Sequence, residues 1–199
     1  MEAVVHAARN EQWPARIAAV ISNKADAKGL EFAAAHGIPT AVVANKEYPS
    51  RDAFDAALQQ VIDGFAPDLV VLAGFMRIVT PAFVDHYDGR LLNIHPSLLP
   101  LFPGLHTHQQ ALDAGETAHG ATVHFVTAQL DHGPVVAQAS VPVLPGDTET
   151  TLAARVLVQE HTLYPRAIRL FIEDRLSIEN GEVRIAPGPL EQPLASTSI

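Results

Sequence analysis

The chain has 199 residues, of which 48% are hydrophobic and 18% charged, and its formal net charge is −9. These proportions are typical of a folded globular protein and favour one domain, with room for a small C-terminal appendage. The acidic charge argues against nucleic acid as a partner, because binding to phosphate backbones needs a basic surface. The absence of cysteine excludes disulfides, thiolate metal sites and thiol nucleophiles. No apolar run reaches the roughly 18 residues of a membrane span and no secretory signal is recognisable, so we expect a cytoplasmic protein without a membrane partner.

Short apolar runs alternate with amphipathic segments along the chain and predict strands and helices in alternation. We expect strands at 16–22, 38–43, 67–74, 91–95, 122–126 and 134–143, and helices at 1–8, 25–37, 50–65, 80–87 and 147–165. Ser50, Thr80 and Asp147 are candidate helix N-caps. Gly37 is a candidate C-terminal cap, and Pro165 should disturb the last helix. This order indicates an α/β fold, Rossmann-like, with a mostly parallel twisted sheet and helices on both faces.

The strand at 91–95 carries two polar residues at its end, Asn93 and His95. Strand side chains alternate, so the amide and the imidazole should share one face at the carboxyl end of the sheet, where ligands bind in such folds. Residues 96–108, which follow, contain three prolines. Such restraint favours a functional site, because chemistry needs precisely held groups. The alternative is a satisfied histidine beside an asparagine that closes a turn.

Asp131 lies in the polar turn at 130–134, before a predicted strand. In a purely structural interpretation, Asp131 is an aspartate that stabilises the turn. Beside His95, however, its carboxylate would favour the protonated imidazole and produce a general acid or base suited to neutral pH. His124 should lie on the polar face of its strand with Thr122, which makes it a secondary candidate for lining the pocket.

Glu160 lies within an apolar stripe on the last predicted helix, made of Ala153, Val156, Leu157, Leu163 and Tyr164. A carboxylate in that position must lie at the edge of the stripe or have a partner. The partner could be an amine or hydroxyl of a ligand, Arg155, or another buried donor.

The sequence supports two other kinds of active site less well, a metal site and a serine hydrolase. His106 and His108 invite a metal site, but no carboxylate pattern accompanies them. Ser97, two residues after His95, suggests a hydrolase nucleophile, but a Gly-x-Ser-x-Gly elbow is missing and Pro96 separates the two residues.

Four stretches carry a family resemblance: "LAGFMRIVTPAFV", "GRLLNIHPSLLPLFPGLHTHQQAL", "HGATVHFVTAQLDHGPVVAQ" and "RVLVQEHTLYP". They resemble the formyltetrahydrofolate-dependent formyltransferases, and within them the glycinamide ribonucleotide formyltransferases of purine (IMP) biosynthesis. The resemblance implies transfer of the formyl group from 10-formyltetrahydrofolate, as co-substrate, to the amine of glycinamide ribonucleotide, without a metal. The alternatives are a formyltetrahydrofolate hydrolase and an inactive folate-binding remnant. The oligomeric state stays open.

The same resemblance implies the site residues. The catalytic group would be Asn93, His95 and Asp131. Folate would lie against Arg51, Met76, Arg77, Ile78, Val79, Asn93, Thr127, Ala128, Gln129, Leu130 and Asp131. The ribonucleotide would meet Gly74, Pro96, Gln159 and Glu160. The match runs from Met1 to about residue 174, so we assign a catalytic domain to 1–174 and a C-terminal hairpin with a loose tail to 175–199.

The first predicted helix, with Met1, Val4, Val5 and Ala8 on one face, lacks the strand and Gly-rich loop that should precede it in a doubly wound sheet. Members of the family resemble that plan. We therefore expect an N-terminally truncated domain that lacks its first strand, with Met1 an internal methionine. Such a chain should be poorly stable and should bind the ribonucleotide phosphate weakly.

Overall fold

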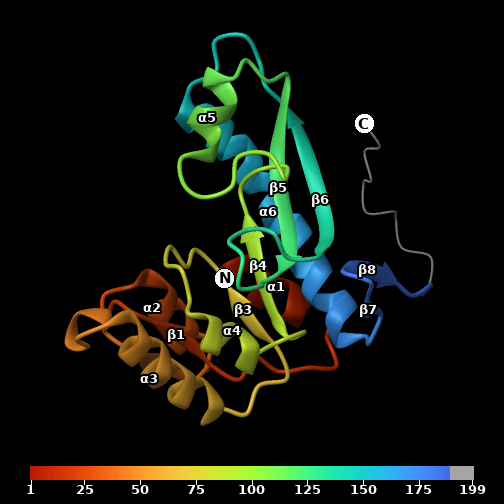
Figure 1. Cartoon of the computed structure of the whole chain (residues 1–199). Coiled ribbons are helices and arrows are strands. Elements are labelled where there is room, and N and C mark those ends of the chain that lie inside the picture. The colour runs from red at the N-terminus through yellow and green to blue at the C-terminus, as the bar shows by residue number, and fades with distance from the viewer. Residues whose placement is uncertain (189–199) are drawn as a thin grey trace.

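The computed structural model describes residues 1–188 as strands flanked by helices (Figure 1). In chain order the elements are α1 Glu2–Asn10, β1 Val20–Ser22, α2 Lys28–Ala35, β2 Thr40–Val42, the 3₁₀ helix η1 Asn45–Glu47, α3 Arg51–Asp63, β3 Val70–Leu72, α4 Pro81–His86, β4 Leu91–His95, α5 Thr107–Asp113, β5 Ala118–Phe125, β6 Val135–Pro142, α6 Glu149–Ile172, β7 Leu176–Glu179 and β8 Glu182–Ile185.

The strands form an α/β arrangement, as predicted, but the sheet is mixed rather than mostly parallel. β1 pairs with β2 in parallel, and β3 pairs with β4 in parallel. β5 and β6 then extend the second sheet in antiparallel fashion, in the order β3-β4-β5-β6. For β5 and β6 the cause is simple: their short connection permits only antiparallel pairing, since a parallel pair needs a long crossover.

Several predicted helix ends are confirmed. The Ser50 hydroxyl accepts a hydrogen bond from the Ala53 N–H at 3.1 Å, and the Thr80 hydroxyl caps α4, which has Pro81 in its first turn. Gly37 follows α2 with a φ of 69°, a left-handed conformation that glycine adopts at little cost. The N–H of Ile38 donates to the Ala33 carbonyl at 2.9 Å, which completes this cap.

The prediction for the last helix was wrong in two respects. Thr148, not Asp147, is the N-cap of α6, because the Asp147 carboxylate is held by the Arg155 guanidinium at 2.7 and 2.9 Å. Pro165 does not end the helix, which continues to Ile172. Proline removes one backbone hydrogen bond, but the buried face continues beyond it through Ala167, Ile168 and Leu170, and its burial offsets that loss.

Other boundaries were displaced. The strand expected at 16–22 pairs only from Val20, and the strand expected at 122–126 begins at Ala118. Helix α5 at Thr107–Asp113 was not predicted. The expected C-terminal hairpin is confirmed as β7 and β8, and Asn180 and Gly181 lie at its turn. The expectation of a loose tail concerns residues that, apart from Gly188, lie outside the described part.

Two clusters of buried side chains form the core. In one, α6 covers β5 and β6, with Val123, Val156 and Tyr164 among its buried members. Val183 of the C-terminal hairpin packs against the same cluster. In the other, Phe54 and neighbours from α3 pack with β3 and α4. Within residues 1–188, none of the helices is both long and apolar enough to cross a membrane.

Candidate active site

Asn93 and His95 share one face of β4, as the strand period predicted. The antiparallel register places Asn93 opposite His124 of β5, and His95 opposite Thr122. Asn93 Nδ2 lies 3.3 Å from His124 Nε2. The His124 ring donates through Nδ1 to the Phe125 carbonyl at 2.9 Å, so its Nε2 accepts from the Asn93 amide. Burial lowers the pKa of His124, which keeps this ring neutral and fixes the orientation of the amide.

Asp131 reaches the same place from the loop between β5 and β6. Its backbone has a φ of 53°, which turns the side chain inward, and the carboxylate is almost completely buried. Oδ2 lies 3.5 Å from His95 Nδ1, and Oδ1 lies 3.9 Å from His124 Nε2. The Gly104 N–H donates to Oδ2 at 2.9 Å. The Asp131 carboxylate therefore faces both imidazoles, and His95 is the nearer of the two.

The second ring nitrogen of His95 is also held. Nε2 lies 2.9 Å from the Phe102 carbonyl, and a carbonyl can only accept, so Nε2 carries a proton. The residue is 5% exposed. Phe102, Gly104 and His106 all have positive φ, and they bend the proline-containing segment around the imidazole. That segment therefore belongs to the site through its backbone, a contribution that the sequence did not identify.

Polar side chains of β5 and β6 anchor this segment. The Thr122 hydroxyl donates to the Ser97 carbonyl at 2.7 Å and accepts from the Leu99 N–H at 3.0 Å. The Gln138 amide donates to the Leu99 carbonyl at 2.8 Å and to the Thr122 hydroxyl at 2.9 Å. In the sequence, the only indication of this role for Thr122 and Gln138 is that each is a polar residue on a predicted strand. Ser97 donates its hydroxyl to the Leu101 carbonyl at 2.6 Å, an anchoring role that does not favour a nucleophile.

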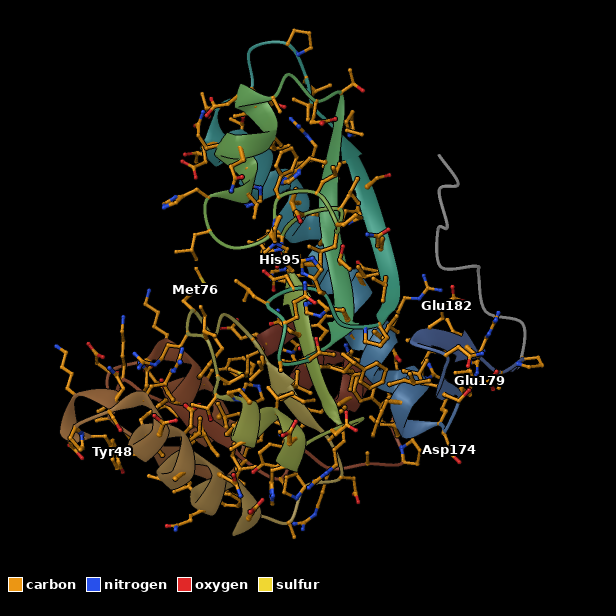
Figure 2. The ribbon with its side chains drawn as sticks, viewed as in Figure 1. Tyr48, Met76, His95, Asp174, Glu179 and Glu182 are labelled. Carbon is orange, nitrogen blue, oxygen red and sulfur yellow. The ribbon has the colours of Figure 1, made fainter. Side chains whose placement is uncertain are left out.

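Apart from Asn93 and Asp131, the residues expected at the folate lie in the loop after β3, at the start of α3 and in the loop between β5 and β6. Met76, 76% exposed, and Ile78 lie in the loop after β3. Figure 2 shows Met76 extending from this loop on the side of the sheet where His95 lies. The Arg77 guanidinium lies 4.9 Å from the ring centroid of Phe54. Phe54 and Arg51 both belong to α3, where they are about one helical turn apart. The expected Thr127–Leu130 segment is the start of the loop that carries Asp131, and Val79 is half-buried before α4.

The residues expected at the ribonucleotide come from three elements. Gly74 follows β3 with a φ of 66°, and Pro96 follows His95 directly. Gln159 and Glu160 are half-buried on α6. Burial raises the pKa of Glu160, and the N-terminal ammonium of Met1 opposes this rise.

Two expectations around Glu160 were wrong. Arg155 is not its partner, because that guanidinium binds Asp147. Leu157 is 46% exposed and does not belong to the buried stripe, since the buried face of α6 runs through Leu152, Val156 and Leu163.

The two histidines that suggested a metal have separate surroundings. The His108 ring lies against His119, with Nδ1 and Nε2 3.1 Å apart, whereas His106 is exposed before α5 with a φ of 58°. Within residues 1–188, no group of three or more potential metal ligands gathers at one point.

The chain is similar to known proteins over most of its length. The Escherichia coli phosphoribosylglycinamide formyltransferase is 54% identical over 178 residues, which cover 89% of this chain and 84% of that protein. The human trifunctional purine biosynthetic protein adenosine-3 is 45% identical over 184 residues, which are 92% of this chain but only 18% of its own length.

Solved structures show the same fold. Glycinamide ribonucleotide transformylase 1 from Symbiobacterium toebii matches with a TM-score of 0.90 and 50% identity, covering 94% of this chain and 88% of its own. A formyltetrahydrofolate deformylase from Pseudomonas syringae matches with a TM-score of 0.86 and 28% identity, covering 94% of this chain and 61% of its own. The formyl transferase family matches residues 1–168. The chain belongs to the formyl transferase family.

Proposed function

We propose that the chain transfers the formyl group of 10-formyltetrahydrofolate to the amine of glycinamide ribonucleotide, in de novo purine (IMP) biosynthesis. The observation that carries this proposal is the meeting of Asn93, His95 and Asp131 at the end of β4. The identity to transferases of that name over most of the chain supports the choice of substrates.

The first step is attack of the amine on the formyl carbon. This forms a carbon–nitrogen bond and places a negative charge on the formyl oxygen. Asn93 and protonated His95 are the donors available for that charge, and preorganised donors are a large source of catalysis in acyl transfer. One N–H of Asn93 is engaged by His124, and the other stays free to donate to the oxyanion.

The second step breaks the bond between the formyl carbon and the folate nitrogen. The attacking amine loses one proton, and the departing nitrogen gains one. His95 carries the mobile proton, and the Asp131 carboxylate stabilises the charged ring. The 3.5 Å separation of Nδ1 and Oδ2 is longer than a hydrogen bond, so the Nδ1 proton remains available to the reacting atoms, directly or through one water. This direct transfer needs no covalent enzyme intermediate.

The remaining residues would bind the two substrates. Exposed Met76 and Ile78 offer apolar contact to the pterin, and Arg51 and Arg77 offer cations to the acidic end of folate. Gln159 and Glu160 on α6 would meet the ribose or the glycine end of the ribonucleotide. These assignments rest on similarity, and the positions at the strand ends support them.

The test is acceptor dependence. The purified chain is incubated with 10-formyltetrahydrofolate, with and without glycinamide ribonucleotide, and formylated ribonucleotide, tetrahydrofolate and formate are quantified. Equal amounts of the first two products, formed only with the acceptor, are the expected result. Formate released without the acceptor would instead establish a formyltetrahydrofolate hydrolase, an alternative raised by the deformylase neighbour. Folate binding without turnover would indicate a binding remnant.

We further propose that the protein works in the cytoplasm on these small molecules, without a metal, a nucleic-acid partner or a membrane partner. The division into residues 1–174 and 175–199 stays a prediction of the sequence.

A further inference from the structure

A histidine directly follows Asp131 in the loop between β5 and β6. This residue, His132, is exposed. Its Nδ1 lies 2.6 Å from the Leu130 carbonyl oxygen. A carbonyl can only accept, so Nδ1 carries a proton and donates it. The His132 ring therefore forms a short bridge between the two residues that flank Asp131.

The bridge spans a residue whose backbone conformation is strained. Asp131 has a φ of 53°, in the left-handed region that a residue with a Cβ adopts only at a cost. Aspartate tolerates this region mainly where its side chain bonds to nearby backbone. The Asp131 carboxylate instead accepts from the Gly104 N–H, 27 residues away, and faces His95. Other contacts must therefore hold the Asp131 backbone in place.

The C-terminal side of Asp131 is held by β5. The buried Gly133 lies so close to the Phe125 carbonyl that a Cβ at this position would overlap the oxygen. The Phe125 N–H donates to the Pro134 carbonyl at 2.9 Å. The Phe125 carbonyl also accepts from the ring of His124. Close packing against the strand therefore fixes this side of the loop.

The N-terminal side of Asp131 has weaker backbone support. The Thr127 hydroxyl donates to the Gln129 carbonyl at 3.2 Å, and the His132 N–H donates to the same carbonyl at 3.3 Å. Both distances are long for hydrogen bonds of their kind. Leu130 itself is 45% exposed. The bond from His132 Nδ1 is the shortest of the three, and it holds the carbonyl of the peptide bond that precedes Asp131.

We propose that His132 is a positioning residue for the reaction and acts through Asp131. Its Nδ1–H fixes the Leu130 carbonyl, so the peptide between Leu130 and Asp131 keeps the orientation that the positive φ requires. The carboxylate is then directed toward His95 and Gly104. One hydrogen bond is comparable in strength to the cost of a left-handed backbone, so its loss should release the carboxylate for part of the time. Nδ1 can keep its proton whether or not the ring is charged, so His132 need not titrate.

The test replaces one ring nitrogen at a time. The side-chain nitrogen of Asn is as many bonds from the backbone as Nδ1 of histidine, and that of Gln is as many as Nε2. His132→Asn therefore keeps the donor to Leu130, whereas His132→Gln moves it and His132→Ala removes it. Denaturant unfolding of each variant establishes that it folds.

The first measurement is amide hydrogen exchange at Gly104, followed by NMR without substrates. The Gly104 N–H donates to the Asp131 carboxylate at 2.9 Å, so its exchange reports whether the carboxylate is in place. Exchange should be about tenfold faster in His132→Ala and His132→Gln, the effect of one lost hydrogen bond, and unchanged in His132→Asn. Equal exchange in the unchanged chain and all three variants would overturn the proposal.

The second measurement is kcat, and this arm alone rests on the proposed formyl transfer. His132→Ala should lower kcat by about tenfold, and His132→Asn should restore it. The loss should vanish when Asp131 is already Asn, because effects that pass through one contact are not additive. An equal loss in both backgrounds would overturn the proposal, as would rescue by His132→Gln instead, which would assign Nε2 to a substrate contact. If no formyl transfer occurs, exchange at Gly104 still decides the positioning role.

Discussion

His108 and His119 form a half-buried pair, with Nδ1 of the first 3.1 Å from Nε2 of the second. His119 also bonds to the Pro96 carbonyl, and it is 1% exposed. The pair therefore joins α5 and β5 to the segment that follows His95. Burial lowers the pKa of His119 to about 4, helped by repulsion from His108 and His95 and opposed by the Pro96 hydrogen bond.

This pair predicts a loss of stability in mild acid. The folded-state pKa of His119 lies below its usual value of about 6.5, so the unfolded chain binds the proton more readily. The contribution to stability is complete above pH 6.5 and is lost as the pH falls toward 4. Denaturant unfolding at pH 7.5, 6 and 5 measures it. His119→Gln, which keeps a hydrogen-bonding amide but does not titrate, should reduce this dependence; an unchanged slope would show that other groups cause it.

His95→Ala should lower the rate of formyl transfer by about 10²-fold or more, the usual effect of losing a general acid and base. The measurement is steady-state turnover with both substrates. His86→Ala removes an exposed imidazole on α4 and is the matched control, which should keep its activity. Near wild-type turnover in the His95 variant would remove this residue from the mechanism.

Asp131→Asn isolates the role of the charge. The Asn side-chain oxygen can still accept from the Gly104 N–H, which Asp131 does now at 2.9 Å, so the loop should keep its conformation. We expect kcat to fall by at least about tenfold, because the protonated ring loses its stabilising partner, while KM for the formyl donor changes little. A rise in KM with unchanged kcat would mean that Asp131 serves to bind folate.

Thr122→Val should destabilise the fold by about 1–3 kcal/mol, because the buried Leu99 N–H loses its acceptor and the Gln138 amide loses one of its two. Thr122→Ser keeps the hydroxyl and is the control. Denaturant unfolding gives the free energies of both variants. If Val costs nothing and Ser is destabilising, the methyl group matters at this position and the hydrogen bonds do not.

Glu160→Gln tests the ribonucleotide side of the site. Loss of the carboxylate should raise KM for glycinamide ribonucleotide by about tenfold, the effect of one charged hydrogen bond, and leave KM for the formyl donor unchanged. Glu149→Gln, an exposed change at the start of the same helix, is the control. An equal change in both KM values would assign Glu160 a structural role.

The sequence predicted the part of the site that local geometry determines. Asn93 and His95 share a face because strand side chains alternate, and this needed only the assignment of one strand. The Asp131 contact was implied by resemblance, since it depends on a positive φ in a loop that period and composition do not predict. The Phe102 carbonyl was not predictable, because any residue carries one and only the folded loop aims it at His95.

The same limit explains the misplaced elements. The patterns identified most strands, but the pairing direction of β5 depends on the length of the connection to β6, and the extent of α6 beyond Pro165 depends on the burial of Ala167 and Ile168 against the sheet. Chain connection decided the first outcome and tertiary packing the second.

Strand β4 is the boundary between the parallel and the antiparallel part of the sheet, because it is parallel to β3 and antiparallel to β5. The proposed catalytic residues come from β4 and from the loop between the antiparallel strands β5 and β6, whereas the exposed Met76 loop and α3 belong to the parallel side. Substitutions on the two sides of β4 should therefore change different properties of the protein. Variation on the parallel side should alter which folate is accepted, whereas variation on the antiparallel side should alter both the rate and the folate contacts expected at residues 127–131. This separation allows selection to change the preference for one substrate without rebuilding the chemistry.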